Sequence, residues 1–194
     1  MRDFTDTTMH TTTTPTTPAE MIETLKAKIR HVPDFPKPGI LFYDITTLLG
    51  DADGFRLAVD ALVRPYRRED VDLVVGVESR GFILGAAVAD RLRAGFVPVR
   101  KVGKLPSKTI RVSYDLEYGS DSLEMHEDGV AKGARVLIVD DLLATGGTAR
   151  ATVDLVKKLG GSVHALAFLI ELAGLNGRAK LQGDNVQSVL KYEF

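Results

Sequence analysis

Two adjacent carboxylates, Asp140 and Asp141, are followed by a short loop rich in glycine and threonine, residues 144–148. Carboxylate oxygens accept hydrogen bonds from the vicinal hydroxyls of a sugar, and they also suit a divalent cation. The glycines let the backbone approach a ligand closely, and the first N–H groups of the helix expected from about residue 149 lack intrahelical partners. Those N–H groups, the helix dipole and the threonine hydroxyls favour a bound phosphate. The segment therefore predicts a ribose 5-phosphate site whose phosphate is held by Ala144, Thr145, Gly146, Gly147 and Thr148.

The residues before this acid pair indicate how it would face a ligand. Residues 136–139 are apolar and mostly β-branched, which is typical of a strand buried on both faces of a parallel sheet. Ligands of open α/β sheets bind at the carboxyl ends of such strands, where Asp140 and Asp141 stand. A turn whose glycines serve only packing is the alternative, but it would explain neither the adjacent acids nor the flanking threonines.

Residues 140–148 resemble the phosphoribosyl-pyrophosphate signature of type I phosphoribosyltransferases, in the form found in adenine-specific members. The resemblance extends from about residue 20 to residue 192. It implies an α/β fold of three layers, with a central, mainly parallel β-sheet flanked by helices and a small hood over a base site. It also implies a purine-salvage reaction in which adenine and 5-phosphoribosyl-1-pyrophosphate give AMP and pyrophosphate.

The periodicity of the chain supplies elements that would position this site. Residues 20–194 predict one domain of alternating helices and strands. Helices are expected from about residue 18 to the stop at Pro33, over 54–68, over 82–93 and from the phosphate-binding loop to Leu159, where Gly160 and Gly161 form a C-cap. Strands are expected over 72–77, 96–99, 136–139 and 163–170, followed by a short helix at 176–181 and a last strand at 186–190.

A second candidate site follows the strand at residues 72–77. Gly76 and Gly81 have the glycine spacing of a Walker motif, but Phe82 stands where that motif needs a lysine, so this reading is rejected. Arg80 at the carboxyl end of a strand instead suits a pyrophosphate group, because its guanidinium offers a fork of donors. A plain surface arginine is the alternative.

Cations follow the strand at 96–99. Arg100, Lys101 and Lys104 would serve a pyrophosphate if they lie at the ligand edge of the sheet, although such runs are mostly solvated. The stretch from about 100 to 119 resembles the flexible loop that closes the active site in the family. Its last residues match the family's Tyr-x-Leu-Glu-Tyr-Gly, and this match implies that Glu117 transfers a proton at the base and that Tyr118 lies near the reaction centre.

The hood is expected at about 31–45 together with C-terminal segments. Its three prolines and one glycine among apolar residues predict a stiff, extended segment rather than a regular element. A loop that covers the core is the alternative, and the resemblance favours adenine recognition, with Leu41, Phe42 and Tyr43 on one side of the base and Leu172 on the other. Tyr43 departs from the family, which commonly carries arginine here.

Composition excludes several classes of protein. The chain has 194 residues, 44% hydrophobic content, a net charge of −1 and no cysteine, so disulfides and thiolate metal sites are excluded and nucleic-acid binding is not indicated. Its apolar runs are too short to span a membrane, and its four histidines lack ligand spacing. The threonine-rich residues 1–19 are expected to be disordered because they cannot bury enough apolar surface.

The remaining expectations concern cofactor, assembly and rivals. Mg²⁺ is expected as cofactor, held through substrate oxygens and not by direct protein ligands. The resemblance implies a homodimer, and the lack of cysteine fits a cytoplasmic location. The alternatives are a phosphoribosyltransferase for hypoxanthine–guanine or xanthine, and a non-catalytic regulator that senses phosphoribosyl pyrophosphate. A regulator usually carries a DNA-binding domain, for which residues 1–19 are too short and too polar.

Overall fold

A computed structural model describes residues 17–115 and 120–193. Its centre is a seven-stranded sheet with the order β5-β6-β4-β3-β7-β8-β9. The pairs β4–β3, β3–β7, β7–β8 and β8–β9 are parallel, and the hairpin β5–β6 continues the sheet in antiparallel fashion beside β4. The strands are β3 (Leu73–Val77), β4 (Gly95–Lys101), β5 (Thr109–Asp115), β6 (Ser120–His126), β7 (Arg135–Leu143), β8 (Ser162–Leu172) and β9 (Val186–Tyr192).

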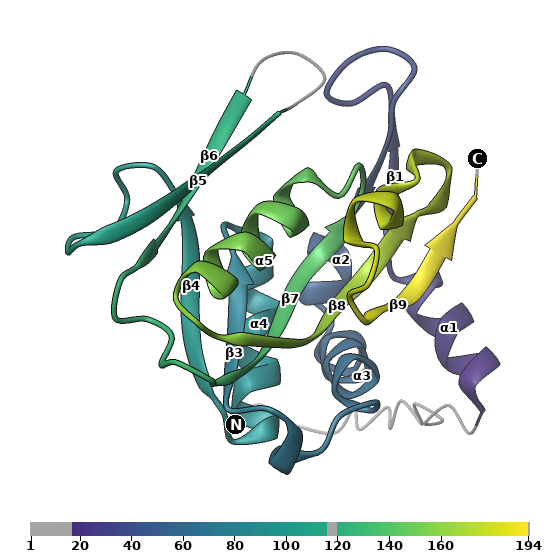
Figure 1. Ribbon diagram of the computed structural model, residues 1–194. Coiled ribbons are helices and arrows are strands. Elements are labelled where there is room, and N and C mark those ends of the chain that lie inside the picture. The colour runs from purple at the N-terminus through teal and green to yellow at the C-terminus, as the bar shows by residue number, and fades with distance from the viewer. Residues whose placement is uncertain (1–16, 116–119, 194) are drawn as a thin grey trace, which may run out of the picture.

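Helices cover both faces of this sheet, with α5 on one face and α3 and α4 on the other (Figure 1). The α-helices are α1 (Pro18–Ala27), α2 (Thr46–Leu49), α3 (Ala52–Val63), α4 (Arg80–Leu92) and α5 (Gly147–Lys158). The described residues also form three 3₁₀ helices, η1 (Arg68–Asp70), η2 (Ala173–Leu175) and η3 (Gly177–Leu181). The α/β class with a mainly parallel sheet between helical layers is therefore confirmed.

The central strand β7 contributes to two cores, as the unalternating apolar run predicted. Val136 and Ile138 belong to the apolar cluster that includes α5, whereas Leu137 and Val139 belong to the cluster that includes α3 and α4. All four side chains have no exposed surface. Because adjacent strand residues point to opposite faces, burial on both sides requires apolar residues in sequence rather than in alternation.

The order of the strands creates a crevice between β3 and β7. The chain leaves β3 through α4 and adds β4 on one side, whereas it leaves β7 through α5 and adds β8 on the other. At such a switch point the two connections diverge, and ligands of open α/β sheets bind in the gap outside the carboxyl ends of the strands. Arg80, at the start of α4, and the acid pair of β7 both lie there.

Several boundaries differ from the sequence-based expectations. Residues 32–44 were expected to lack regular structure, but β1 (Arg30–Pro33) and β2 (Leu41–Asp44) form an antiparallel pair. Pro36 and Pro38 lie in the turn between the strands, and Pro33 is the last residue of β1, so the prolines leave the flanking residues free to pair. Helix α3 ends at Val63 and not at residue 68, since Pro65 has no N–H to donate to the next helical hydrogen bond. Helices α4 and α5 each begin two residues early.

The N-terminal boundary of the fold also lies earlier than composition predicted. Pro18 and Ala19 form the first turn of α1, and Thr17 is its N-cap. The Thr17 side chain accepts a hydrogen bond from the Glu20 backbone, and the Glu20 carboxylate accepts one from the Thr17 backbone, which is a capping box. The rest of the expected disordered segment, residues 1–16, lies outside the described part of the chain.

Candidate active site

The phosphate-binding loop predicted from the sequence joins β7 to α5. Gly146 is the N-cap residue of α5 and has a left-handed backbone with φ of 78°, which glycine adopts without steric cost. Gly147 and Thr148 form the first helical turn, so their N–H groups are among the unpaired donors of the helix start. The loop borders a cavity of about 430 Å³, the ribose-phosphate cavity, which is lined by residues 78–80 and 140–149.

The acid pair forms the floor of this cavity. Asp141 is only 7% exposed, and its backbone N–H donates to the Asp140 carboxylate at 2.9 Å. Burial raises the pKa of both carboxyl groups; the charge of Asp141 adds to the rise at Asp140, whereas Arg80 opposes the rise at Asp141. Hydroxyl donors from a ligand would stabilise the ionised carboxylates.

Arg80 lies in the cavity wall and is held by two partners. Its Nε is 2.6 Å from Oδ2 of Asp141, and its guanidinium carbon lies 5.3 Å from the centre of the Phe42 ring. The first contact joins the start of α4 to the end of β7, and the second reaches strand β2. Arg80 therefore stands beside Asp141 and lines the same cavity as the acid pair.

The cations at the end of β4 contact an acid that the sequence reasoning missed. Glu78 accepts hydrogen bonds from Arg100 Nε and from the Lys101 backbone, both at 3.1 Å, and these bonds lower the pKa of its carboxyl group. Arg100 also donates to the Lys104 carbonyl oxygen at 3.1 Å. Arg100 is thus engaged within the protein rather than solvated. The signal available in the sequence was an acid at the carboxyl end of a buried strand.

The hairpin β5–β6 contacts both Lys101, at the end of β4, and Thr148, at the start of α5. Lys101 Nζ is 3.5 Å from the Asp121 carboxylate, and Tyr114 donates to that carboxylate at 3.5 Å. The Thr148 hydroxyl donates to the Tyr114 hydroxyl at 3.2 Å. Sequence reasoning gave Tyr114 no role, because only the folded hairpin brings β5 over α5. Residues 109–115, expected within a flexible loop, form a regular strand.

A second cavity of about 540 Å³, the base cavity, adjoins the first at Thr145, which lines both. Leu41 and Tyr43 line it from the same face of β2, and Leu172 lines it from the end of β8. Sequence reasoning missed its other lining residues, Gly39, Ile40 and Leu175. Phe42 alternates to the other face of β2, where its ring packs edge-on against Phe35 and beneath Arg80.

Two predicted residues, Glu117 and Tyr118, lie outside the described residues. Within residues 17–115 and 120–193, no group of three or more His, Cys, Asp or Glu side chains is arranged to hold a metal ion. None of the helices in these ranges is both long and apolar enough to cross a bilayer.

Comparisons with known proteins agree with this geometry. A model of the phosphoribosyl transferase domain matches residues 49–188. The chain is similar to the adenine phosphoribosyltransferase of Acidobacterium capsulatum, with 60% identity over 170 residues that cover 88% of this chain and 94% of the relative. It is also similar to the crystal structure of adenine phosphoribosyltransferase from Rhodothermus marinus, with 56% identity, a TM-score of 0.86 and coverage of 90% of this chain and 99% of the other. The Saccharomyces cerevisiae enzyme, crystallised with adenine and an iminoaltritol bisphosphate, is 38% identical, with a TM-score of 0.84 and coverage of 89% and 99%.

Proposed function

The chain belongs to the phosphoribosyl transferase domain family, and on that premise we propose that it transfers the phosphoribosyl group of 5-phosphoribosyl-1-pyrophosphate to adenine, giving AMP and pyrophosphate. One observation carries the proposal: a phosphate-binding loop and a buried acid pair line one cavity, and an apolar cavity adjoins it at Thr145. A polar cavity and an apolar cavity that share Thr145 suit two substrates, a phosphorylated ribose and a base, that react with each other at C1 of the ribose.

The ribose phosphate would bind along the end of β7. The loop N–H groups and the Thr145 hydroxyl would hold the 5-phosphate, and the Thr148 hydroxyl would exchange its bond to Tyr114 for one to the phosphate. Asp140 and Asp141 would accept hydrogen bonds from the ribose hydroxyls. This orientation would leave C1 facing the base cavity and the pyrophosphate beside Arg80, which lines the ribose-phosphate cavity. Lys101 and Lys104 do not line that cavity, and they are assigned to the pyrophosphate by their position at or just after the end of β4. Arg80 and the acid pair already contact each other, so binding exchanges part of the Arg80–Asp141 interaction for contacts with substrate.

In the reaction, a ring nitrogen of adenine forms a bond to C1 while the bond between C1 and the pyrophosphate oxygen breaks. The transition state would resemble an oxocarbenium ion, and the negative charge of the buried Asp141 and the half-buried Asp140 would stabilise it through the ribose. Glu117 is assigned the proton transfer at the base by its match to the family motif. Exclusion of water would protect the cation-like centre from hydrolysis.

Base choice follows from the apolar cavity. Leu41, Tyr43 and Leu172 would contact a planar ring on its faces, and the neighbouring backbone would read its edge. Adenine presents an amino donor where hypoxanthine and guanine present a carbonyl, so a backbone acceptor left facing the carbonyl would cost about 1–3 kcal/mol. The adenine bound in the crystallised Saccharomyces cerevisiae relative, whose fold is similar over 89% of this chain, supports the same choice here.

The proposal includes magnesium as cofactor. The site offers oxygen donors suited to this ion, because Asp140 and Asp141 face the ribose-phosphate cavity and would face a cation bound through substrate oxygens. When bound, magnesium neutralises negative charge on the departing pyrophosphate. Arg80, Lys101 and Lys104 would add protein cations on the same side.

We further propose a cytoplasmic homodimer. The absence of cysteine fits a reducing compartment, and the family resemblance supports two subunits. Light scattering on the purified chain tests the second point, with a mass of twice 21.1 kDa expected.

One assay tests the function. Purified protein is incubated with magnesium and phosphoribosyl pyrophosphate together with adenine, hypoxanthine, guanine or xanthine, and nucleotide is measured. Formation of AMP alone is the expected result. Conversion of another base with higher kcat/KM would replace adenine as the substrate, and tight binding of phosphoribosyl pyrophosphate with no product from any base would favour a regulator.

A further inference from the structure

We propose that Gly177 is a positioning residue for the phosphate-binding loop and that its bare backbone is the surface on which residues 144–146 rest. The inference depends on the proposed function, because it assigns a supporting wall to the loop that would hold the 5-phosphate. A β-carbon on Gly177 would overlap the Ala144 carbonyl oxygen and lie 3.0 Å from the Gly146 backbone nitrogen. In turn, a β-carbon on Gly146 would overlap the Gly177 carbonyl oxygen. The two backbones therefore touch with no room for a side chain on either.

Gly177 is fixed from the sheet rather than from the loop. The next residue, Arg178, forms a forked ion pair with Glu171 at 2.6 and 2.7 Å, and it also donates to the Val186 carbonyl oxygen at 3.0 Å. Glu171 is 5% exposed and lies at the carboxyl end of β8. A bidentate fork on a buried carboxylate restrains both the position and the orientation of Arg178, so the backbone at Gly177 is tied to β8 and β9.

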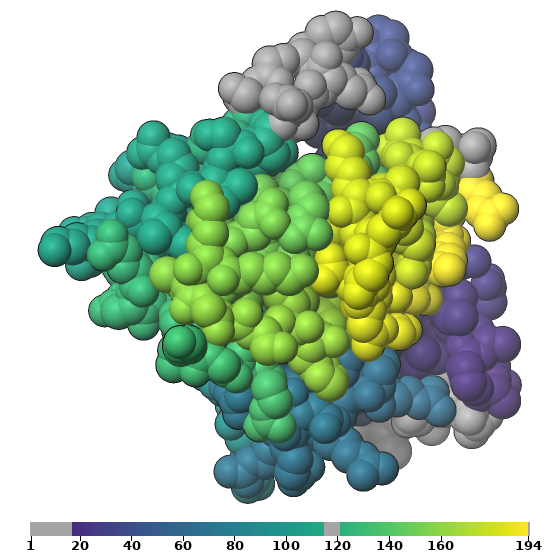
Figure 2. Space-filling view, viewed as in Figure 1, coloured from purple at the N-terminus to yellow at the C-terminus, as the bar shows by residue number. Residues whose placement is uncertain are grey.

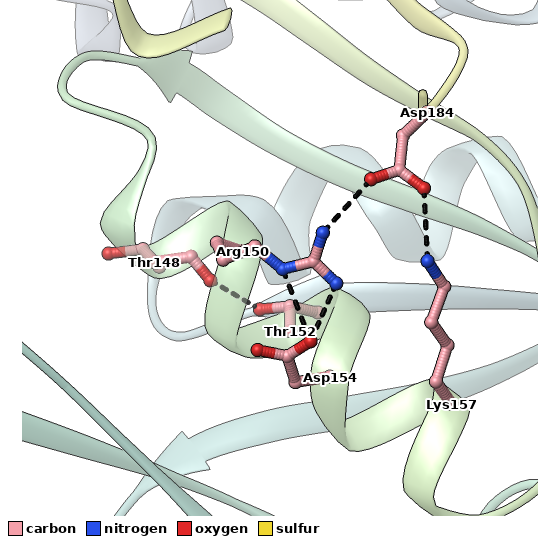
Figure 3. A network of polar contacts seen from close by, with 6 residues as sticks. All are labelled: Thr148, Arg150, Thr152, Asp154, Lys157 and Asp184. Atoms are coloured by element: carbon pink, nitrogen blue, oxygen red, sulfur yellow. Dashed lines mark hydrogen bonds and ion pairs between the residues drawn. The ribbon is translucent and has the colours of Figure 1, made fainter. Parts of the chain in front are cut away.

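Helix α5, which follows the phosphate-binding loop, is also tied to the segment between β8 and β9 that contains Gly177. Arg150, in the first turns of α5, lies 3.2 Å from the Asp184 carboxylate, and Lys157 lies 3.3 Å from it (Figure 3). Arg150 also pairs with Asp154, which restrains its guanidinium. Figure 2 shows α5 and the chain after β8 side by side on one face of the molecule. The loop is thus held between two anchored elements.

The consequence is a fixed distance between the phosphate and the base. Leu172 and Leu175, which line the base cavity, precede Gly177 in the same short segment. A methyl group at position 177 would push the loop away from this segment, and with it the N–H groups aimed at the phosphate. A displacement of about 1 Å at a binding site can cost about 100-fold in activity.

The test measures binding of ribose 5-phosphate by calorimetry and steady-state kinetics in matched glycine variants. For Gly177→Ala we expect Kd for ribose 5-phosphate and KM for phosphoribosyl pyrophosphate to rise by at least ~10-fold, with KM for adenine within about two-fold. Gly183→Ala is the control, because Gly183 follows in the same segment and has φ of 86°, but a β-carbon there meets nothing within 4 Å. It should lower the Tm by strain and leave Kd unchanged.

A second variant, Arg178→Lys, tests the inference even if Gly177→Ala folds poorly. Arg178→Lys keeps the charge and removes the fork, so it loosens Gly177 without adding an atom to the contact, and a Kd increase of about 3-fold or more is expected. Wild-type affinity in both variants would overturn the inference, as would an equal loss in Gly183→Ala. If the wild type itself binds no ribose 5-phosphate, the proposed function falls together with the inference.

Discussion

The ribose-phosphate cavity and the base cavity adjoin at Thr145, but they are built in different ways. The first is lined by two continuous stretches, residues 78–80 and 140–149, at the carboxyl ends of neighbouring parallel strands. The second gathers residues from β2, from the phosphate-binding loop and from the end of β8. The first offers mainly backbone donors and carboxylates, whereas the second offers apolar side chains.

This difference separates two tasks. Charged groups of the substrate would be held by elements that the sheet fixes, whereas the base would be held by a two-stranded pair that joins no other strand in the described residues. Leu41, in strand β2, is 44% exposed, whereas Asp141, at the carboxyl end of the central strand β7, is only 7% exposed. Substitutions should therefore affect the two substrates separately, and the following experiments measure that separation.

The largest effect is expected on the chemical step at the base. Replacing Glu117 by glutamine removes the assigned proton transfer and should lower kcat by about 10²–10⁴, or roughly 3–5 kcal/mol of barrier. KM for phosphoribosyl pyrophosphate should stay within a few-fold, because the ribose-phosphate cavity is untouched. Steady-state kinetics with AMP detection measures both. A kcat within a few-fold of the wild type would remove Glu117 from the mechanism.

The next effect concerns the ribose-phosphate cavity. Asp141→Asn removes a charge that would accept ribose hydroxyls, and a hydrogen bond to a charged group contributes about 1.5–3 kcal/mol, so KM for phosphoribosyl pyrophosphate should rise ~10- to 100-fold. KM for adenine should change little. Asp128→Asn, at an exposed turn, is a matched control and should behave as the wild type. Equal changes in both KM values would contradict the division between the cavities.

The reverse result is expected in the base cavity. Leu172→Ala removes apolar surface that would cover the base. Because Leu172 is already half-buried without the base, we expect the lower end of the about 1.5–3 kcal/mol for burying a leucine side chain, which is ~10-fold weaker adenine binding. KM for phosphoribosyl pyrophosphate should be unaffected. Leu172→Met, which conserves volume, should restore most of the affinity. Competition assays with AMP and ribose 5-phosphate separate the two, and a loss shared by both ligands would show that Leu172 acts through the fold.

The same contrast explains what the sequence could predict. Strand β7, the acid pair and the phosphate-binding loop are contiguous, and each rests on a local rule: burial on both faces, ligand binding at strand ends, and phosphate binding at a helix start. The parallel sheet and its helical layers follow from the same periodicity. The position of Arg80 just after β3 could be read in the same way, but its ion pair with Asp141 and its contact with the Phe42 ring could not, because both partners lie far away in the sequence.

Contacts between distant segments could not be read in this way. The pairing of Tyr114 with Thr148 and the approach of Gly177 to Gly146 depend on how whole elements pack. Strands β1 and β2 were missed because a proline-rich turn dominated the local pattern, while their stability comes from pairing with each other. Glu78 was missed because its role depends on Arg100, a residue on the neighbouring strand.

The smallest effect expected is on stability, and it has opposite signs in two parts of the molecule. Burial and the charge of Asp141 raise the pKa of Asp140 in the folded protein, so the fold binds this proton more tightly than the unfolded chain does, and stability falls as pH rises above the ordinary value of 3.8. Asp140→Asn should therefore raise the Tm at pH 7, by ~2–4 °C for each ~1 kcal/mol relieved, with a gain that shrinks as pH is lowered toward 3.8.

Asp72 provides the opposite case, away from the cavities. Hydrogen bonds from Arg135 lower the pKa of Asp72 to about 2, so ionised Asp72 stabilises the fold above the ordinary value of 3.8, and this contribution is lost as pH falls toward 2. Asp72→Asn should lower the Tm at pH 7, the reverse of Asp140→Asn. Thermal unfolding of both variants across pH measures the signs. A Tm that falls at pH 7 in Asp140→Asn would mean that ionised Asp140 stabilises the fold. It would contradict the view that this carboxylate destabilises the free protein and is retained for binding the ribose.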